Sequence, residues 1–438
     1  MCLVNSRIYL EGEFVEADLG IRKGKVCSIG HGIDAEDFHD VRGKILLPGF
    51  IDPHVHFELF VGKHTSVDGF HAGSISAAFG GITTFIDFLD PVRRAQDIPK
   101  AFENRLKRAQ NSFCDYSFHV TLADPLDPAH KIAEECLDLG LSSVKIFTTY
   151  SETDRRTPDS FIYQLCKVSS EKHIVMCVHA ENDEIIRSFK KNFTHYSQLS
   201  SVRPSVSETT EVLKISEMIS ETEGMAYFVH VSSGNTVERV RLAFSEDLGT
   251  HVRLESCPHY FCFTNRDLLK SEGYLFTMCP PLRSEEERKK LFQEIENIYT
   301  IGTDHCSFMR NQKRENSIEN LPMGVGGIEF SFVVMYDLFG SRVIDKFSKN
   351  VAQTFGLYPK KGTLLPGSDA DIVVFDPDHE WTLSSHHSRS DYNIYANRTV
   401  RGRITDTLLR GKFLVKDMKF TSMDNRGSFV SREEVMWK

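Results

Sequence analysis

The chain of 438 residues is long enough for one large domain or two moderate ones, and its 40% hydrophobic and 26% charged residues are typical of a globular protein. The net charge of −9 is mild and the lysines and arginines are scattered, which argues against nucleic acid as a partner. No apolar run approaches the roughly 18 residues of a membrane helix, and residues 1–14 lack a signal-peptide pattern, so we expect a cytoplasmic protein without membrane partners.

Residues 1–48 contain short strand-like pieces separated by glycines and charged turns. The pieces SRIYLEGEF, ADLGIRKGKVCSIG and KILLPG have no helical period. This segment therefore predicts part of a β domain.

Eight short β-branched or apolar runs then recur, beginning at residues 49, 81, 115, 144, 174, 225, 252 and 299. Amphipathic stretches of helical length, such as 208–220 and 235–248, lie between most of them. Strands that alternate with helices indicate a parallel sheet, and eight of them predict an α/β fold of the closed (β/α)8, or TIM, barrel type. An open doubly wound sheet is the competing architecture, disfavoured because no G-x-G-x-x-G follows an early strand.

The C-terminal part of the chain resembles its beginning in pattern. Residues 363–376 (TLLPGSDADIVVFD) and 399–416 (TVRGRITDTLLRGKFLVK) are again strand-like. We expect one small β-sandwich formed by both termini, from residues 1–48 and from residues 363–438, which also include a tail, with a barrel of residues 49–362 inserted between them.

Two histidines one residue apart end the first barrel run, FIDPHVHF at 50–57. Side chains alternate between the faces of a strand, so His54 and His56 point the same way and could bind a metal ion. Chance is the alternative explanation of this pair, because the chain has 18 histidines.

Four further polar residues fall within or at the ends of later runs: Lys145, His179, His230 and Asp304. In a (β/α)8 barrel the loops after the strands build the active site. Four imidazoles and a carboxylate suit zinc or another borderline divalent ion. A single strand histidine is more often structural, but their joint occurrence favours a metal centre.

Lys145 is the informative member of this set, because these ligands are one bridging group short of holding two ions. As a structural residue it would be neutral or paired with a carboxylate. As a functional residue its amine would add CO2, and the two oxygens of the resulting carbamate could bridge the ions.

At this point the chain resembles the cyclic amidohydrolases of the amidohydrolase superfamily, and most closely the D-hydantoinases and dihydropyrimidinases. The resemblance covers nearly the whole chain. Its motifs are PGFIDPHVHFE at 48–58, AAFGGITTFIDF at 77–88, VKIFTTY at 144–150, VHAEN at 178–182, VHVSS at 229–233, MCPPLR at 278–283, IGTDHCSF at 301–308 and GSDADIVVFDP at 367–377.

The resemblance implies two divalent metal ions, expected to be zinc, and a hydrolase that opens the cyclic amide bond of a hydantoin or dihydropyrimidine ring. His54, His56 and Asp304 would hold the more buried ion, His179 and His230 the more exposed one, and carboxylated Lys145 would bridge them. A hydroxide shared by both ions would be the nucleophile.

Two catalytic roles follow from the same resemblance. Asp304 would accept the proton of the hydroxide and return it to the leaving nitrogen. Tyr150 would donate a hydrogen bond to the carbonyl oxygen of the substrate as charge builds there. The alternative role of Tyr150 is that of a packed aromatic residue at a strand end.

The substrate-binding positions depart from the family pattern. Main-chain groups hold the imide edge of the ring in hydantoinases, and the matching positions are Cys279 and Gly326, where serine and asparagine are usual. Replaced side chains need not abolish such contacts, so we do not expect Cys279 to be a nucleophile. The loops at 58–70 and 150–161, which match those around the 5-substituent of the ring, are more polar here.

Other functions stay open. Dihydroorotases generally carry an arginine shortly after H-x-H, and HVHFELFVGKH has none, which disfavours an acidic substrate. An allantoinase, or another cyclic-imide hydrolase, would use the same site. A non-catalytic scaffold related to dihydropyrimidinase would have lost metal ligands, whereas all six are present. The family also implies a homotetramer or homodimer.

The remaining polar residues have simpler interpretations. His305 either contacts the site beside Asp304 or is structural; His71 and His259 are further candidates, and His386 and His387 are expected to be structural. The cluster RSEEERKK at 283–290 predicts a solvated helix face. Ten cysteines without a C-x-x-C indicate reduced thiols rather than a disulfide framework.

Overall fold

A parallel eight-stranded sheet forms the centre of the computed structural model, which describes residues 1–191, 193–315, 317–421, 426–435 and 437. Its strands are β6 (Phe50–Asp52), β9 (Ile82–Phe88), β10 (Asp115–Thr121), β11 (Ser143–Phe147), β12 (Val175–His179), β13 (Ala226–Phe228), β14 (Val252–Ser256) and β15 (Thr300–Ile301). They pair in this order. Val55 pairs with His305 beyond the ends of β6 and β15, so the sheet closes. The predicted (β/α)8 barrel is confirmed.

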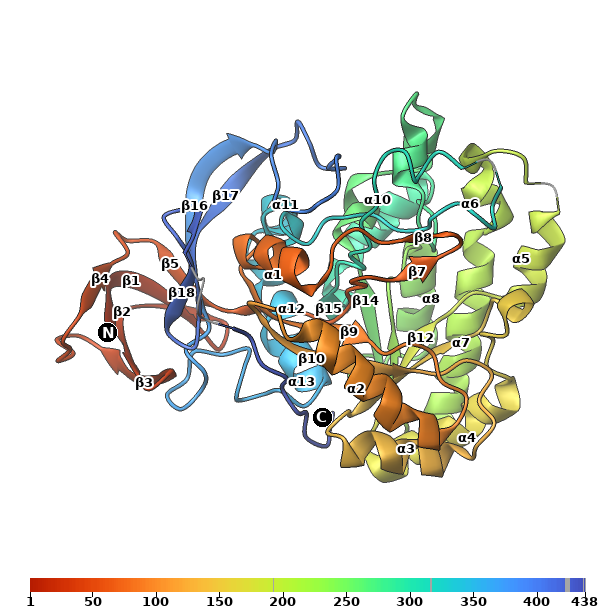
Figure 1. Ribbon diagram of the computed structural model, residues 1–438, viewed down its shortest axis with the longest axis horizontal. Coiled ribbons are helices and arrows are strands. Elements are labelled where there is room, and N and C mark those ends of the chain that lie inside the picture. The colour runs from red at the N-terminus through yellow and green to blue at the C-terminus, as the bar shows by residue number, and fades with distance from the viewer. Residues whose placement is uncertain (192, 316, 422–425, 436, 438) are drawn as a thin grey trace.

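Helices surround this sheet (Figure 1). The longer ones are α1 (Phe70–Phe79), α2 (Ile98–Ala109), α3 (Ala129–Asp138), α4 (Asp159–Lys172), α5 (Asp183–Lys190), α7 (Ser205–Thr222), α8 (Gly234–Ala243), α10 (Glu285–Gln293) and α11 (Ser331–Phe339). The shorter ones are α6 (Leu199–Val202), α9 (Pro258–Cys262), α12 (Ile344–Phe347) and α13 (Lys349–Thr354). Helix α7 buries Val212, Ile215 and Ile219, whose spacing gives a helix one apolar face. The predicted helix at 235–248 ends earlier, at Ala243.

The two ends of the chain form one nine-stranded, mostly antiparallel sheet beside the barrel (Figure 1). Its strands are β1 (Cys2–Leu10), β2 (Glu13–Arg22), β3 (Lys25–Gly30), β4 (Phe38–Asp40), β5 (Ile45–Pro48), β16 (Ile372–Thr382), β17 (Thr399–Leu409), β18 (Lys412–Lys416) and β19 (Lys419–Phe420). N-terminal β5 pairs with C-terminal β16, and residues from both ends share a separate apolar core. The predicted β domain built from both termini is therefore confirmed.

A buried lysine connects the two parts of the molecule. Lys361 Nζ lies 2.8 Å from Asp115 on β10, 3.1 Å from Asp369 and 2.6 Å from Asp371. Asp371 directly precedes β16, and Asp369 lies three residues before its start. The barrel is thus joined to the β domain by a buried ion-pair cluster.

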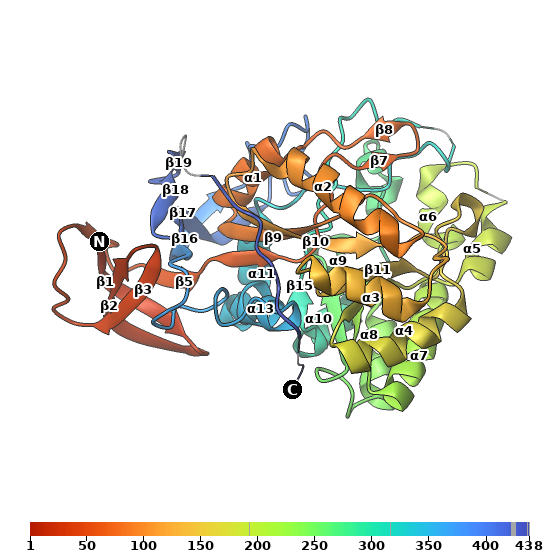
Figure 2. The same ribbon diagram turned by 60° about the horizontal axis from the view of Figure 1, so that its bottom comes forward.

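The C-terminal segment leaves the β domain and returns to the barrel, as Figure 2 shows. The N–H of Val430 donates to the carbonyl of Tyr116, and Arg432 donates to Ser143 Oγ and to the carbonyl of Phe118. The segment that follows the β domain therefore packs against the barrel.

Two further expectations can be compared with the structure. All ten cysteines are among the described residues and carry free thiols, most of them buried. Within the described ranges, no helix combines the length and the apolar character needed to cross a membrane.

Candidate metal centre

Three predicted ligands converge at the carboxyl ends of the first and last barrel strands. Nε2 of His54 lies 3.1 Å from Nε2 of His56 and 3.2 Å from Oδ1 of Asp304. The same Asp304 oxygen lies 3.1 Å from Nε2 of His56. One ligand atom from each of these residues therefore falls within 4.8 Å of the others.

A second pair of predicted ligands lies beside this group. Nδ1 of His179 is 3.0 Å from Nε2 of His230, and the rings of His230 and His54 are 5.3 Å apart between centroids. The structure thus brings together four histidines and one aspartate that the sequence spreads over residues 54–304.

Hydrogen bonds on the far sides of two rings set which nitrogens face the site. Nδ1 of His54 donates to Glu255 Oε1 at 2.9 Å, and Nε2 of His179 donates to Glu181 Oε2 at 2.7 Å. The inward nitrogens of these rings therefore carry lone pairs when the imidazoles are neutral.

Burial favours the unprotonated rings that metal ions require. It lowers the pKa of His54 and His230 well below the usual value and the pKa of His179 to about 4. Burial alone would raise the pKa of Asp304, but the facing His54 and His56 outweigh it and hold that pKa well below its usual range. These groups are ready to coordinate without first losing a proton.

Lys145 lies in β11 with its side chain among these ligands, and it is 2% exposed. Its Nζ packs over the rings of Phe88 and Phe147 at 5.6 and 5.3 Å from their centroids. Among the described residues no carboxylate lies within ion-pair distance of it. Burial lowers the pKa of Lys145 to about 8, which favours the neutral amine that can react with CO2.

The donor set fits divalent cations. Nε2 of His54, Nε2 of His56 and Oδ1 of Asp304 face one another at about 3 Å, and at least two of these three atoms are acceptors. His230 Nδ1 is buried and has no hydrogen-bond partner among the described residues. Mutual repulsion of such acceptors is relieved by a cation between them.

Loop conformations rather than strands position four of the ligands. His54 and His56 follow the end of β6, His230 lies two residues beyond β13 and Asp304 three beyond β15. His230 and Asp304 have φ angles of 43° and 50°, in the left-handed region that costs energy for residues other than glycine. The sequence predicted these residues at strand ends, and the structure places them just past the ends.

The structure places the predicted substrate-binding residue Tyr150 beside the ligand His179 and brings the segments of Cys279 and Gly326 together. Tyr150 follows β11, and its ring centroid is 5.2 Å from that of His179. The segments of Cys279 and Gly326 adjoin, because the N–H of Gly324 donates to the carbonyl of Thr277 at 3.1 Å. Burial raises the pKa of the Cys279 thiol, which opposes a role as nucleophile.

Histidines outside the ligand set have structural partners or none. Nε2 of His305 lies 2.9 Å from Asp68 Oδ2, and its Nδ1 accepts the N–H of Gly327 at 3.1 Å, next to Gly326. His387 donates to Glu329 at 2.9 Å and stacks on Phe79. His259 is buried with Nε2 unpartnered among the described atoms, and His71 is exposed. None of the last three joins the ligand group.

Several charged residues near the site escaped the sequence analysis. Lys313 is fully buried and donates to the carbonyls of Thr277 at 2.7 Å, Pro322 at 2.9 Å and Gly324 at 2.7 Å, which ties the Cys279 segment to the Gly326 segment. Glu181, in the VHAEN motif, and Glu255, in the run VRLES, accept hydrogen bonds from the ligand histidines, but nothing in their local sequence indicates this role.

The cluster RSEEERKK is only partly a solvated helix face. Glu286 and Lys289 on α10 are exposed, as expected, but Arg283 and Glu287 are buried. Arg283 donates from Nε to Ser232 Oγ at 2.9 Å, and Glu287 accepts from Ser233 Oγ at 2.7 Å. The prediction is corrected for these two residues, because a run of charges does not reveal which members find buried partners.

A second group of carboxylates does not resemble a metal centre. Asp115, Asp369 and Asp371 approach one another closely, but the ammonium of Lys361 lies among them. A cation is therefore already present in the form of a side chain.

Comparison with known sequences agrees with this geometry. A model described as the amidohydrolase family matches residues 45–414. The chain is 31% identical over 456 aligned residues to a D-hydantoinase of Geobacillus stearothermophilus, covering 98% of this chain and 95% of that relative.

Solved structures of hydantoinases and dihydropyrimidinases are also similar to this chain. A dihydropyrimidinase from Brevibacillus agri superposes with a TM-score of 0.93 at 28% identity, covering 99% of each chain. An L-hydantoinase (dihydropyrimidinase) from Arthrobacter aurescens superposes with a TM-score of 0.88 at 26% identity, covering 98% of this chain and 99% of the other.

Proposed function

Because this chain belongs to the amidohydrolase family, we propose that it is a metal-dependent hydrolase that opens the cyclic amide bond of a hydantoin or dihydropyrimidine ring. The observation that carries the proposal is the convergence of His54, His56 and Asp304, with His179 and His230 beside them, at the mouth of the barrel. The names of the relatives at 28–31% identity over nearly the whole chain support the substrate class.

The proposed metal centre holds two divalent ions, with zinc as the expected metal. His54, His56 and Asp304 would hold one ion, His179 and His230 the other, and a carbamate on Lys145 would contribute a ligand oxygen to each. When bound, the ions lower the pKa of water and place positive charge beside the substrate carbonyl.

Carbamate formation at Lys145 requires only CO2 as a second reactant. The lone pair of the neutral amine forms a bond to the carbon of CO2, one C=O π pair moves to oxygen, and the amine proton leaves to solvent. The low-dielectric site supports this proposal because it disfavours the charged ammonium, which could not react.

Asp304 is the proposed proton carrier. The histidines face its Oδ1, which leaves Oδ2 free to accept a proton from the attacking water and to pass it to the ring nitrogen as the carbon–nitrogen bond breaks. The lowered pKa of Asp304 supports a carboxylate that is ionised before each turnover.

Three residues are proposed to hold the substrate. The hydroxyl of Tyr150 would donate to the carbonyl oxygen, where negative charge develops. Main-chain groups of Cys279 and Gly326 would hold the imide edge of the ring. The hydrogen bonds from Lys313 to the carbonyls of Thr277 and Gly324 support a fixed spacing between these two segments.

The proposal also includes a homotetramer or homodimer in a reducing, cytoplasmic compartment. Ten free cysteines support the compartment, because a disulfide framework would be expected to form in an oxidising one. The oligomeric state rests on family resemblance and would be measured by light scattering.

A substrate panel tests the proposed function. Protein prepared with zinc and bicarbonate would be incubated with hydantoin, phenylhydantoin, dihydrouracil, allantoin and dihydroorotate, and ring opening would be followed by loss of ultraviolet absorbance. We expect turnover of hydantoins or dihydrouracil and little turnover of dihydroorotate. Preferential opening of allantoin would replace the proposed substrate class, and inertness toward every ring would reject the enzyme.

A further inference from the structure

A buried arginine links a metal-site histidine to the residue proposed to contact the substrate carbonyl. Arg203 is 6% exposed and precedes α7. Its Nε lies 3.1 and 3.2 Å from the two carboxylate oxygens of Glu181, its Nη2 also donates to Glu181, and the same Nη2 donates to Tyr150 Oη at 3.2 Å. The guanidinium carbon is 5.1 Å from the centroid of the Tyr150 ring.

We propose that Arg203 is a positioning residue, which fixes His179 through Glu181 and orients the hydroxyl of Tyr150 toward the substrate. The inference rests on the proposed function, because it concerns how the same site works. No part of it was visible in the sequence, where Arg203 appears in an unremarkable SVRPS segment.

The contact with Tyr150 sets the direction of the phenol hydrogen. A phenol oxygen can donate one hydrogen bond and accept others. Because the N–H of Arg203 occupies an acceptor position, the O–H hydrogen must point away from the guanidinium. The adjacent positive charge also makes that O–H a stronger donor.

The contact with Glu181 supports the ligand His179. Glu181 is fully buried and accepts a hydrogen bond from His179 Nε2, which keeps Nδ1 directed toward His230. An isolated carboxylate at this depth would be costly, so the guanidinium fork is what allows Glu181 to stay there as an acceptor.

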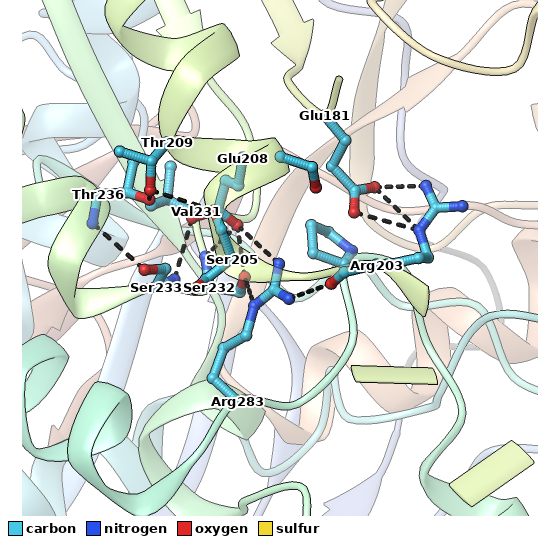
Figure 3. Close-up of polar contacts among 12 residues, drawn as sticks. Glu181, Arg203, Ser205, Glu208, Thr209, Val231, Ser232, Ser233, Thr236 and Arg283 are labelled. Atoms are coloured by element: carbon cyan, nitrogen blue, oxygen red, sulfur yellow. Dashed lines mark hydrogen bonds and ion pairs between the residues drawn. The ribbon is translucent and has the colours of Figure 1, made fainter. Parts of the chain in front are cut away.

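A second arginine holds the first in place, as Figure 3 shows. Nη1 of Arg283 donates to the backbone carbonyl of Arg203, and Nε of Arg283 donates to Ser232 Oγ at 2.9 Å. Glu208 accepts from the N–H groups of Ser232 at 3.1 Å and Ser233 at 3.0 Å. The loop that follows His230 and the support of His179 therefore belong to one connected network.

An arginine is needed at this position because one group serves two acceptors in different directions. A planar guanidinium can bind a carboxylate with two N–H groups and still donate to a third oxygen. A lysine would offer one nitrogen in place of the separate Nε and Nη2 of Arg203, so an ammonium placed against Glu181 would not be fixed against Tyr150 as well.

The test uses the full-length zinc-loaded protein and two variants, Arg203→Met and Arg203→Lys. At saturating zinc we expect Arg203→Met to lower kcat on the order of 10- to 100-fold with little change in KM, and to weaken zinc binding by a similar factor in equilibrium dialysis. Arg203→Lys should lower kcat to the same extent but keep zinc affinity within about twofold of the parent protein.

A double-mutant cycle with Tyr150→Phe separates positioning from general damage. If Arg203 acts through Tyr150, adding Arg203→Met to Tyr150→Phe should slow kcat at saturating zinc by no more than about twofold. If the reductions in kcat caused by the two substitutions multiply in the double variant, the inference is wrong. It is also wrong if Arg203→Met leaves both kcat and zinc affinity unchanged.

A matched control is Arg253→Met. Arg253 is 2% exposed near the start of β14, away from the metal-site end, and packs against the rings of Tyr299 and Trp437. It should lower the melting temperature without changing kcat or zinc affinity. The unmutated protein is assayed first. An inert unmutated protein would reject the proposed function, whereas an active one with unaffected Arg203 variants would reject only the role of Arg203.

Discussion

Nε2 of His54 and Oδ1 of Asp304 lie 3.2 Å apart, at the ends of the first and last strands of the barrel. Closure of the sheet creates this contact, because Val55 and His305, the neighbours of these two residues, pair across the seam. Closure of the barrel thus forms the proposed metal site, and the contribution of each of its residues can be tested by substitution.

Asp304→Asn should lower kcat on the order of 10²- to 10⁴-fold, because an amide cannot accept the proton that the leaving nitrogen needs. The variant should keep its fold, since asparagine has nearly the same size. Initial rates with hydantoin and circular dichroism would check both points. Asp378→Asn, with a side chain 77% exposed, is the control and should match the parent protein.

Tyr150→Phe should lower kcat by about 10²- to 10³-fold while KM changes little, because the lost hydrogen bond is made mainly to the developing oxyanion. Steady-state kinetics on the preferred substrate would give both constants. Tyr163→Phe, at an exposed hydroxyl that donates to Glu221, is the control. A rise in KM at constant kcat would instead assign Tyr150 to ground-state binding.

Lys145→Met should reduce the number of bound zinc ions, because it removes the oxygens that a carbamate would supply. Elemental analysis after dialysis should give about two ions per chain for the parent protein and clearly fewer for the variant. Lys346→Met removes another buried lysine, one that donates to the carbonyl of Ile298 far from the ligands, and should leave the ion count unchanged. Equal counts in all three proteins would contradict a ligand role for Lys145.

Cys279→Ser should leave kcat/KM within about tenfold of the parent value, because main-chain atoms are expected to hold the ring at this position. The raised pKa of the thiol predicts the same outcome. Complete loss of activity in the serine variant would restore a nucleophilic role for Cys279.

Lys361→Met should destabilise the protein by about 3–5 kcal/mol, because it leaves three buried carboxylates without their central cation. Urea unfolding would measure the change. Lys107→Met, at an exposed lysine that pairs with Glu103 on α2, serves as the surface control and should change stability little.

The effect of Lys361→Met should also depend on pH. Burial raises the pKa of Asp371, and in Asp115 the nearby Lys361 and Arg410 outweigh burial and lower its pKa. A carboxyl group with a lowered folded pKa contributes stability above its ordinary pKa near 4 and loses it as the pH falls. Without Lys361 the carboxyls can instead bind protons in the folded state, so the destabilisation should shrink between pH 7 and pH 3. A difference that stays constant over this range would contradict the account.

The barrel and its ligands could be predicted from sequence because their signals are local. Strands such as Ile82–Phe88 and Val175–His179 are short β-branched or apolar runs, and turns and helices separate them. His54, His179 and Asp304 each stand at the end of such a run. The rule that barrel strands end at one mouth then brings them together without knowledge of coordinates.

The supporting charges could not be predicted in this way, because their partners are distant in sequence. Glu181, Arg203 and Arg283 form one chain of contacts only after α7 and the loop before α10 pack against the barrel. A charged residue in a polar segment is usually solvated, and the run around Arg283 has this pattern although Arg283 itself is buried. Burial of paired charges is set by tertiary packing, and the sequence alone carries little trace of it.

The most direct test of the central claim is ring opening of hydantoin measured with bound zinc before and after chelation. The account predicts about two zinc ions per chain in active protein, loss of turnover as the ions are removed, and recovery when zinc and bicarbonate are returned. Turnover that survives complete removal of metal, or fully loaded protein that opens neither hydantoin nor dihydrouracil, would contradict it.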